Sequence, residues 1–174
     1  MKLLRWKRFT WEVSKLPPLE NSLPSRYTLR PAQRDEMETV SGVIMRALSL
    51  DPAWSDSLKL FRDRLATQIA ASFERENVPA LVIAHGPRII AASTFETDAE
   101  AENHLDSGPC VLTEYHSRGL GTALLHATLQ QLRHDGLDHV HGVTRHNVVA
   151  SKFVYRKFGA VSADFEPTLA LAHA

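Results

Sequence analysis

The sequence predicts an α+β fold in which one sheet contains both antiparallel and parallel strand neighbours. Two apolar runs, 79–84 and 89–95, flank turn-forming residues and predict an antiparallel hairpin. Residues 111–136 read as a short strand, a glycine-bearing turn and an amphipathic helix, and a further strand-like run follows at 139–144. Because a strand–helix–strand unit forms a right-handed crossover, this second feature predicts a parallel pair of strands.

Length and charge limit the classes of protein to which the chain can belong. Its 174 residues and 44% hydrophobic content suit one globular domain. Lysine plus arginine and aspartate plus glutamate number 20 each, so there is no basic surplus for nucleic-acid binding. No apolar run reaches the ~20 residues of a membrane span, and the first residues lack the apolar core of a secretory signal. The single cysteine, Cys110, fits a reducing compartment, and we expect a cytoplasmic protein that binds neither nucleic acid nor membrane.

Residues 1–26 are expected to lie outside the domain, which then spans 27–174. Basic and aromatic residues alternate at the start of this segment, and the proline-rich stretch KLPPLENSLPS follows as an extended linker. We interpret the segment as an arm that packs on the domain or on a partner subunit through its tryptophans. The alternative is an arm that reaches a membrane surface or nucleic acid, although its few basic charges give only a modest attraction.

Within the domain, each element follows from the spacing of its apolar residues and from the turn residues that flank it. The expected elements, in order, are a strand at 27–30, helices at 37–48 and 58–73, the hairpin at 79–95, the strand at 111–113 with its helix, a strand at 139–144, a short helix at 149–157, and closing strands at 161–165 and 168–172.

The stretch 111–136 has the composition of an anion-binding site. Its leucines recur at helical spacing, and Gly136 stands where a left-handed residue ends a helix. The first N–H groups of a helix have no intrahelical acceptors and carry partial positive charge. Gly119 and Gly121 would let a phosphate approach the backbone. A Walker loop is excluded because its Gly-Lys-Ser/Thr ending is absent, and a Rossmann fingerprint because Leu124 replaces its third small residue.

The residues of this turn resemble a known family. Residues 116–121, HSRGLG, resemble motif A of the GNAT superfamily of acetyl-CoA-dependent N-acetyltransferases, with His116 where the family has arginine or glutamine. Residues 147–150, NVVA, and 155–159, YRKFG, resemble the halves of motif B, with a spacer one residue longer than usual. Taking Ser151 as the small residue of that motif repairs the spacing but moves the asparagine position to a valine.

This resemblance covers residues 27–165 and implies the three-layer GNAT fold, in which helices cover both faces of a central mixed sheet of six or seven strands. It also implies that acetyl-CoA is the co-substrate and lies between the fourth and fifth strands of that sheet, with its pyrophosphate at the turn. The cofactor-binding residues that the resemblance implies are Val111, Leu112, Thr113, His116, Ser117, Arg118, Gly119, Leu120, Gly121, Thr122 and Asn147. We expect no metal, because the histidines do not form a zinc-spaced pair with a carboxylate.

The implied reaction is direct attack of a neutral amine on the thioester, which needs a base, an oxyanion donor and an acid. The resemblance assigns the acid to Tyr155, and Glu114 is the candidate base at the end of the central strand. Other bases remain open: a relayed water, Glu96, His116, His139 and His141.

The acceptor is expected to be a small-molecule or peptide amine. No lysine or arginine occurs between Ile89 and Ser117, whereas acids are frequent there, and this pattern favours a cationic acceptor. Two alternatives stay open: a non-catalytic acyl-CoA-binding module that regulates a partner, and transfer of another short acyl group. The resemblance is also compatible with a homodimer.

Overall fold

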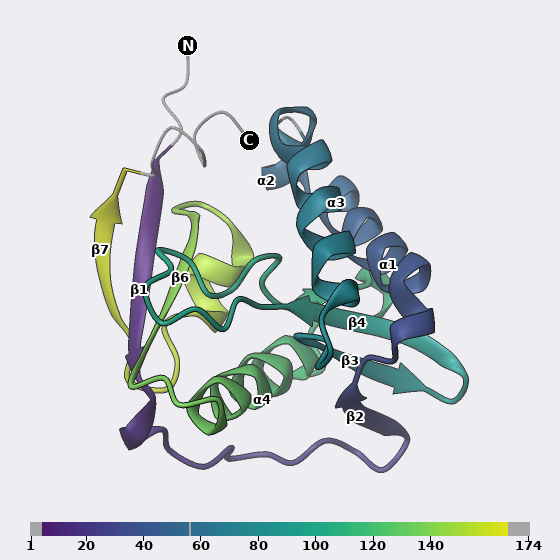
Figure 1. Ribbon diagram of the computed structural model, residues 1–174, viewed down its shortest axis with the longest axis horizontal. Coiled ribbons are helices and arrows are strands. Elements are labelled where there is room, and N and C mark those ends of the chain that lie inside the picture. The colour runs from purple at the N-terminus through teal and green to yellow at the C-terminus, as the bar shows by residue number, and fades with distance from the viewer. Residues whose placement is uncertain (1–4, 56, 167–174) are drawn as a thin grey trace.

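The computed structural model describes residues 5–55 and 57–166, and its strands form two antiparallel sheets (Figure 1). One sheet has the order β2-β3-β4-β5 and the other the order β6-β1-β7. The strands are β1 (Trp6–Glu12), β2 (Tyr27–Pro31), β3 (Ala80–His85), β4 (Arg88–Thr94), β5 (Cys110–Val111), β6 (His139–Arg145) and β7 (Val161–Phe165). The helices are α1 (Met37–Leu50), α2 (Pro52–Ser55), α3 (Leu58–Glu74) and α4 (Leu120–His134), with the short turns η1 (Val13–Lys15), η2 (Arg34–Glu36), η3 (Thr113–Tyr115) and η4 (Ala150–Val154).

Helices cover both faces of the first sheet, which confirms the predicted α+β class. α1 packs on β4 and on α3, whereas α4 contacts β3 and β4 from the opposite face (Figure 1). Because both faces are covered, β3 and β4 are continuous apolar runs, and Val82, Ile83 and Ile90 are fully buried. The predicted hairpin is confirmed, since β3 and β4 pair antiparallel across a turn in which Gly86 has a φ of 59°.

Helix α4 begins and ends at the glycines that the sequence marks. Gly119 precedes the helix with a φ of 75°, and Gly136 follows it with a φ of 97°. The N–H of Leu137 donates to the carbonyl of Leu132 at 3.1 Å, and that of Gly136 to the carbonyl of Arg133 at 3.0 Å. These two bonds form a Schellman motif, which satisfies carbonyls that the end of a helix leaves without partners.

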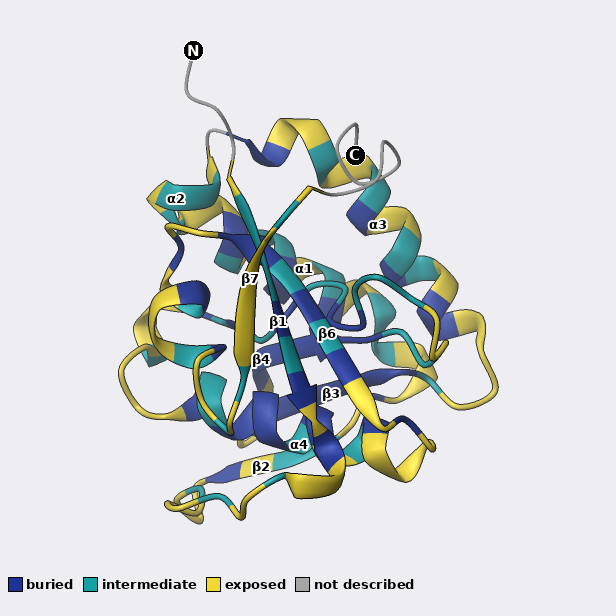
Figure 2. Ribbon diagram, turned by 90° about the vertical axis from the view of Figure 1, so that its left-hand side faces the viewer, coloured by how far each residue is buried: buried dark blue, intermediate teal, exposed yellow. Residues whose placement is uncertain are grey.

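Strand β1 differs from the arm that we expected at residues 1–26. It lies between β6 and β7 and pairs antiparallel with both. Phe9, Trp11 and Val13 are buried, and the indole N–H of Trp11 donates to the carbonyl of Lys157 at 2.9 Å. Alternate residues therefore face the core, which is the period of a strand, and Thr10 and Glu12 between them lie on the more exposed face. β7 itself is exposed along most of its length (Figure 2).

The parallel strand pair that we expected is not found among the described residues, and every described pair of strands is antiparallel. β5 is only two residues long and belongs to the first sheet, whereas β6 belongs to the second. On its side opposite β1, β6 bonds to a loop: the N–H of His104 donates to the carbonyl of His141 at 2.7 Å, and the N–H of Val143 donates to Asn103 Oδ1 at 3.0 Å. The two sheets therefore part between β5 and β6.

The helix expected at 149–157 is shorter than predicted and has a π-helical turn over η4. The N–H of Tyr155 donates to the carbonyl of Ala150, five residues back, at 2.7 Å. A π turn holds one residue more than an α turn, so it accommodates the extra residue in the spacer of the sequence motif. The strand expected at 161–165 is β7, whereas the one expected at 168–172 lies outside the described residues.

Candidate active site

The N-terminus of α4 lies beside the opening between β5 and β6. A Cβ placed on Gly121 would lie 3.8 Å from a methyl of Val111 in β5 and 4.0 Å from a methyl of Val154 in η4. The first intrahelical bond runs from the N–H of Ala123 to the carbonyl of Gly119 at 3.1 Å. The N–H groups of residues 120–122 precede it and have no acceptor among the described residues. Three aligned donors and a missing Cβ make a cradle that fits a phosphate group.

Two side chains of this turn, His116 and Arg118, contact other residues of the chain through their polar atoms. His116 Nε2 lies 2.8 Å from the carbonyl oxygen of Val111. Arg118 donates to the hydroxyl of Tyr27 at 3.0 Å, and its guanidinium lies 5.2 Å from the centre of the Tyr115 ring. Arg118 is therefore directed toward β2 rather than toward the free N–H groups of α4.

The other expected cofactor residues lie on both sides of the opening. Leu112 is buried and donates its N–H to the carbonyl of Ile90 at 3.0 Å, so that part of the backbone is already paired. Ser117 has a φ of 61°, which turns the chain into the helix, and Thr113 is exposed at the start of η3. Asn147 is exposed in the turn after β6 and has no hydrogen bond to a described residue.

Tyr155 occupies a slot that two glycines leave open. A Cβ on Gly108 would collide with its hydroxyl oxygen, and a Cβ on Gly142 would lie 3.2 Å from its ring. Phe9 and Trp11 each pack edge-on against the ring, with centroids 5.6 Å away. Burial, with a smaller effect from Cys110, raises the pKa of Tyr155 above its ordinary value. The hydroxyl therefore stays protonated at neutral pH, and the same shift makes it a weaker proton donor than an exposed tyrosine.

Glu114, the expected base, lies on the surface. Its carboxylate accepts a hydrogen bond from Arg88 at 2.9 Å, and its side chain is 42% exposed. A hydrogen bond from its own backbone and the contact with Arg88 lower the pKa of Glu114. A lower pKa makes a carboxylate a weaker proton acceptor, so this position is poorly suited to a general base.

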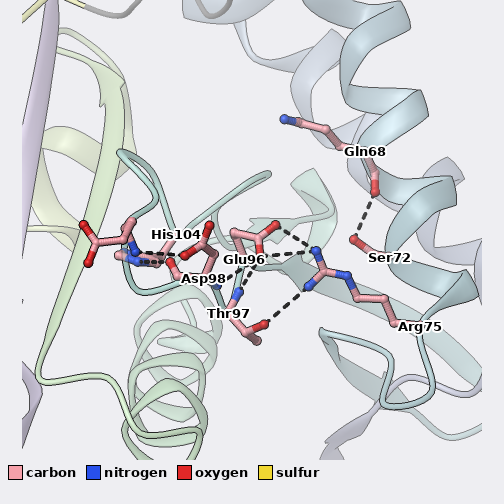
Figure 3. A network of polar contacts seen from close by, with 8 residues as sticks. Gln68, Ser72, Arg75, Glu96, Thr97, Asp98 and His104 are labelled. Atoms are coloured by element: carbon pink, nitrogen blue, oxygen red, sulfur yellow. Dashed lines mark hydrogen bonds and ion pairs between the residues drawn. The ribbon is translucent and has the colours of Figure 1, made fainter.

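Two acids of the segment that follows β4, Glu96 and Asp98, bind other groups of the protein (Figure 3). Glu96 forms an ion pair with Arg75 at 2.9 Å and accepts hydrogen bonds from the N–H groups of Thr97 and Asp98. Burial raises the pKa of Glu96, but these partners outweigh burial and lower it. Asp98 accepts a bond from the N–H of Glu100 at 3.0 Å. The carboxylates of Glu96 and Asp98 are therefore occupied within the protein, whereas Glu100 in the same segment is exposed.

His104 and His141 are also engaged in packing. His104 is fully buried, its Nδ1 accepts the N–H of His141 at 2.9 Å, and its Nε2 lies 2.9 Å from the carbonyl of Asp98. The two rings stack with centroids 5.5 Å apart. Burial is the main cause that lowers the pKa of both histidines. Of the histidines considered as bases, His139 is exposed and His116 contacts the backbone at the turn.

A cavity of about 100 Å³ lies between the helices α1 to α3 and the strand β6. Its wall includes Tyr155 and a carboxyl group that our sequence analysis did not select, Asp106. Burial, and secondarily the charge of Glu96, raises the pKa of Asp106 to about 7. Such a value is suited to a general base near neutral pH. The residues that line the cavity are Trp6, Leu48, Trp54, Phe61, Arg64, Leu65, Gln68, Asn103, Leu105, Asp106, Ser107, Val143, Thr144 and Tyr155.

The signal for Asp106 in the sequence was weak. It is one of several acids between β4 and β5, and only its place just before the short strand distinguishes it. Its burial results from α3 and β6, which are distant in the sequence. Cys110, in contrast, is buried, and burial raises the pKa of its thiol to about 12, which excludes a thiolate nucleophile at neutral pH.

A sheet that parts beside the N-terminus of a helix, with a buried tyrosine next to the opening, is the arrangement of an acetyltransferase fold. The model of the acetyltransferase (GNAT) family matches residues 44–160, and the chain belongs to this family. The family uses acetyl-CoA, and membership implies acyl transfer from acyl-CoA. No curated protein is similar enough in sequence to count as a match.

Solved structures share the fold at low sequence identity. A Drosophila protein superposes with a TM-score of 0.64 at 16% identity, covering 92% of this chain and 48% of its own. A GCN5-related N-acetyltransferase from Sphaerobacter thermophilus has a TM-score of 0.63 at 14% identity, covering 94% of this chain and 50% of its own. A tandem GNAT protein of the clavulanic acid pathway has a TM-score of 0.55 at 14% identity, covering 97% and 55%. The chain thus spans about half the length of these proteins.

Within residues 5–55 and 57–166, no cluster of three or more histidine, cysteine, aspartate or glutamate side chains is arranged to hold a metal ion. Over the same residues, no helix has both the length and the apolar composition needed to cross a membrane.

Proposed function

We propose that the chain transfers an acetyl group from acetyl-CoA to a primary amine by direct attack. The observation that carries this proposal is the cavity that Asp106 and Tyr155 both line, next to the opening between β5 and β6. One side chain is suited to accept a proton near neutral pH, and the other remains protonated. An amine and a thioester bound in this cavity would be lined by a base, Asp106, and by an acid, Tyr155.

The turn before α4 is the proposed site for the co-substrate. The N–H groups of residues 120–122 would donate to its pyrophosphate, and Gly121 leaves room beside Val111 for the chain that follows. When bound, acetyl-CoA supplies an activated acyl group. We keep the other expected contacts, from residues 111–119 and from Asn147, as proposals.

The proton transfers follow from the two cavity residues. Asp106 would take a proton from the acceptor's ammonium group, which leaves a neutral amine able to attack. A carbon–nitrogen bond then forms as the carbon–sulfur bond breaks, and Tyr155 would give a proton to the departing thiolate. The nitrogen would pass its second proton to the Tyr155 oxygen, which restores the phenol, and Asp106 would release its proton to solvent. In this proposal Asp106 takes the role that we first gave to Glu114, because the Arg88 partner keeps the pKa of Glu114 low.

The expected preference for a cationic acceptor depends mainly on Asp106 as well. The charge of Glu96 is balanced by Arg75, and Asp98 binds backbone N–H. Of the acids between β4 and β5, Asp106 is the one that lines the cavity, so a protonated amine in the cavity would be attracted to this carboxyl. We also propose a cytoplasmic location, supported by the free, buried Cys110, and we leave a homodimer as an expectation for a sizing experiment.

The test is thiol release from acetyl-CoA by the purified full chain with a panel of amines. Amine-dependent release with formation of the N-acetyl product would support the proposal. Tight CoA binding without transfer to any amine would favour the non-catalytic module instead. Faster reaction with propionyl-CoA or succinyl-CoA would keep the acyl-transfer chemistry but change the acyl group.

A further inference from the structure

The cavity beside Tyr155 carries two opposite charges that do not neutralise each other. Arg64 from α3 and Asp106 from the loop before β5 both line it. The salt bridges between described residues join other pairs, so these two charged groups are not within ion-pair distance. No described residue hydrogen-bonds the carboxylate of Asp106. The positive charge of Arg64 nevertheless acts on this carboxyl group and lowers its pKa, against the larger effect of burial.

Arg64 has a donor for which the described residues provide no acceptor. Its Nη1 is buried and has no hydrogen-bond partner among the described residues. A buried donor without a partner is unfavourable, and native proteins leave few such groups. A ligand that brings an anionic oxygen into the cavity would satisfy this donor with a charge-assisted hydrogen bond.

The remaining lining includes the polar residues Gln68, Asn103, Ser107 and Thr144, and its aromatic and aliphatic side chains form an apolar wall. Trp54 packs edge-on against Phe61, with centroids 5.3 Å apart, and lies 6.2 Å from the ring of Trp6. Leu48, Leu65 and Val143 complete this wall. A cavity of about 150 Å³ is known to accommodate benzene, so one of about 100 Å³ fits a branched aliphatic group better than an aromatic ring.

We propose that the amine acceptor is an α-amino acid with a branched aliphatic side chain. The inference rests on the proposed function, and it names the acceptor class for the same site. The amino group would lie at Asp106, the carboxylate at Arg64 and the side chain against the aromatic wall. In the reaction, the amino nitrogen bonds the acetyl carbon, the carbon–sulfur bond breaks, Asp106 takes one amine proton and the thiolate is protonated to CoA. The product is an N-acetyl amino acid.

A binding experiment tests the acceptor class independently of turnover. Trp6 and Trp54 line the cavity, so the tryptophan fluorescence of the full chain should report occupancy. L-leucine is compared with 3-methylbutylamine, which lacks the carboxylate, with 4-methylpentanoate, which lacks the amine, and with spermidine. We expect leucine to bind at least about tenfold more tightly than each of the others, since a charge-assisted hydrogen bond contributes on that scale.

Variants of one helix separate recognition from stability. Arg64→Gln should reduce leucine binding about tenfold or more and leave 3-methylbutylamine unchanged, with Arg64→Lys between the two. Arg62→Gln is the matched control, because Arg62 is exposed on the same helix and does not line the cavity. The melting temperature of Arg64→Gln should not fall, because the lost Nη1 donor has no partner among residues 5–55 and 57–166.

Each outcome decides one of the two proposals. The acceptor class is overturned if 3-methylbutylamine or spermidine binds as tightly as leucine, if no compound binds, or if Arg64→Gln weakens leucine and 3-methylbutylamine equally. If leucine binds in the expected pattern but is not acetylated from acetyl-CoA, the proposed function fails and the binding site stands.

Discussion

At the residue scale, Tyr155 has a ring with a packing role and a hydroxyl available for chemistry. The ring packs against Phe9 and Trp11, and no described residue hydrogen-bonds the hydroxyl. Tyr155→Phe keeps the ring and removes the proton donor. We expect acetyl transfer to fall by about 10²- to 10⁴-fold, with CoA binding and melting temperature unchanged. Steady-state kinetics measure acetyl transfer, and a thermal shift with CoA measures binding and melting temperature. Unchanged turnover would assign the tyrosine to packing alone.

Asp106 gives a prediction for stability as a function of pH. Its pKa is raised from 3.8 to about 7, so the folded state binds this proton more tightly than the unfolded state. The resulting stability is present below the unfolded pKa and is lost as pH rises through the folded pKa. Urea unfolding at several pH values measures this effect. The free energy of unfolding of wild type should fall, relative to that of Asp106→Asn, as the pH rises from about 4 to 8.

Activity should change in the opposite direction. The base must be ionised, so turnover of wild type should rise with pH through about 7, and Asp106→Asn should be nearly inactive at every pH. Glu114→Gln is the control, because Glu114 is ion-paired on the surface. Equal losses in the two variants, or a flat pH profile, would remove Asp106 from the base role.

At the element scale, a substitution at the start of α4 should change the stability of the helix and its affinity for CoA in opposite directions. A Cβ on Gly121 meets only ordinary contacts at 3.8 and 4.0 Å, so Gly121→Ala should fold and gain up to ~1 kcal/mol of helix propensity. The same methyl narrows the approach to the N–H cradle, and we expect CoA affinity to fall about tenfold or more, the scale of one lost charge-assisted hydrogen bond.

Gly42→Ala is the matched control for this element. Gly42 lies inside α1, and a Cβ there meets nothing within 4 Å. It should raise the melting temperature and leave the CoA-induced thermal shift unchanged. If Gly121→Ala binds CoA as tightly as Gly42→Ala does, the turn is a structural helix entry only.

At the scale of the whole molecule, β1 pairs with β7, so residues 6–12 form a sheet with residues 161–165. Trp11 is fully buried and packs on Tyr155. Trp11→Ala should reduce the free energy of unfolding by about 3–5 kcal/mol, as measured in urea. Trp54→Ala, at the half-buried wall of the cavity, should cost clearly less. Similar small losses for both would indicate that the segment is an arm, as the sequence analysis expected.

Much of the fold was predictable because its signals are local. The hairpin, the helices α1 and α3, and the glycines at both ends of α4 follow from spacing and turn chemistry over a few residues. Tyr155 and the turn at 116–121 were selected from short motifs as candidate site residues, and their roles stay predictions. The position of Asp106 and the pairing of Glu96 with Arg75 were not, because both depend on segments that are far apart in the sequence.

The sequence by itself determined the order of the elements, the class of the fold and the family resemblance, because these depend on periodicity and on short motifs. Only the tertiary structure decided that residues 6–12 are the middle strand of a sheet, that β5 and β6 part, and that Asp106 and Arg64 share a cavity with Tyr155. Strand partners, burial and pKa depend on what surrounds a residue in space, and a local pattern of residues does not specify those surroundings.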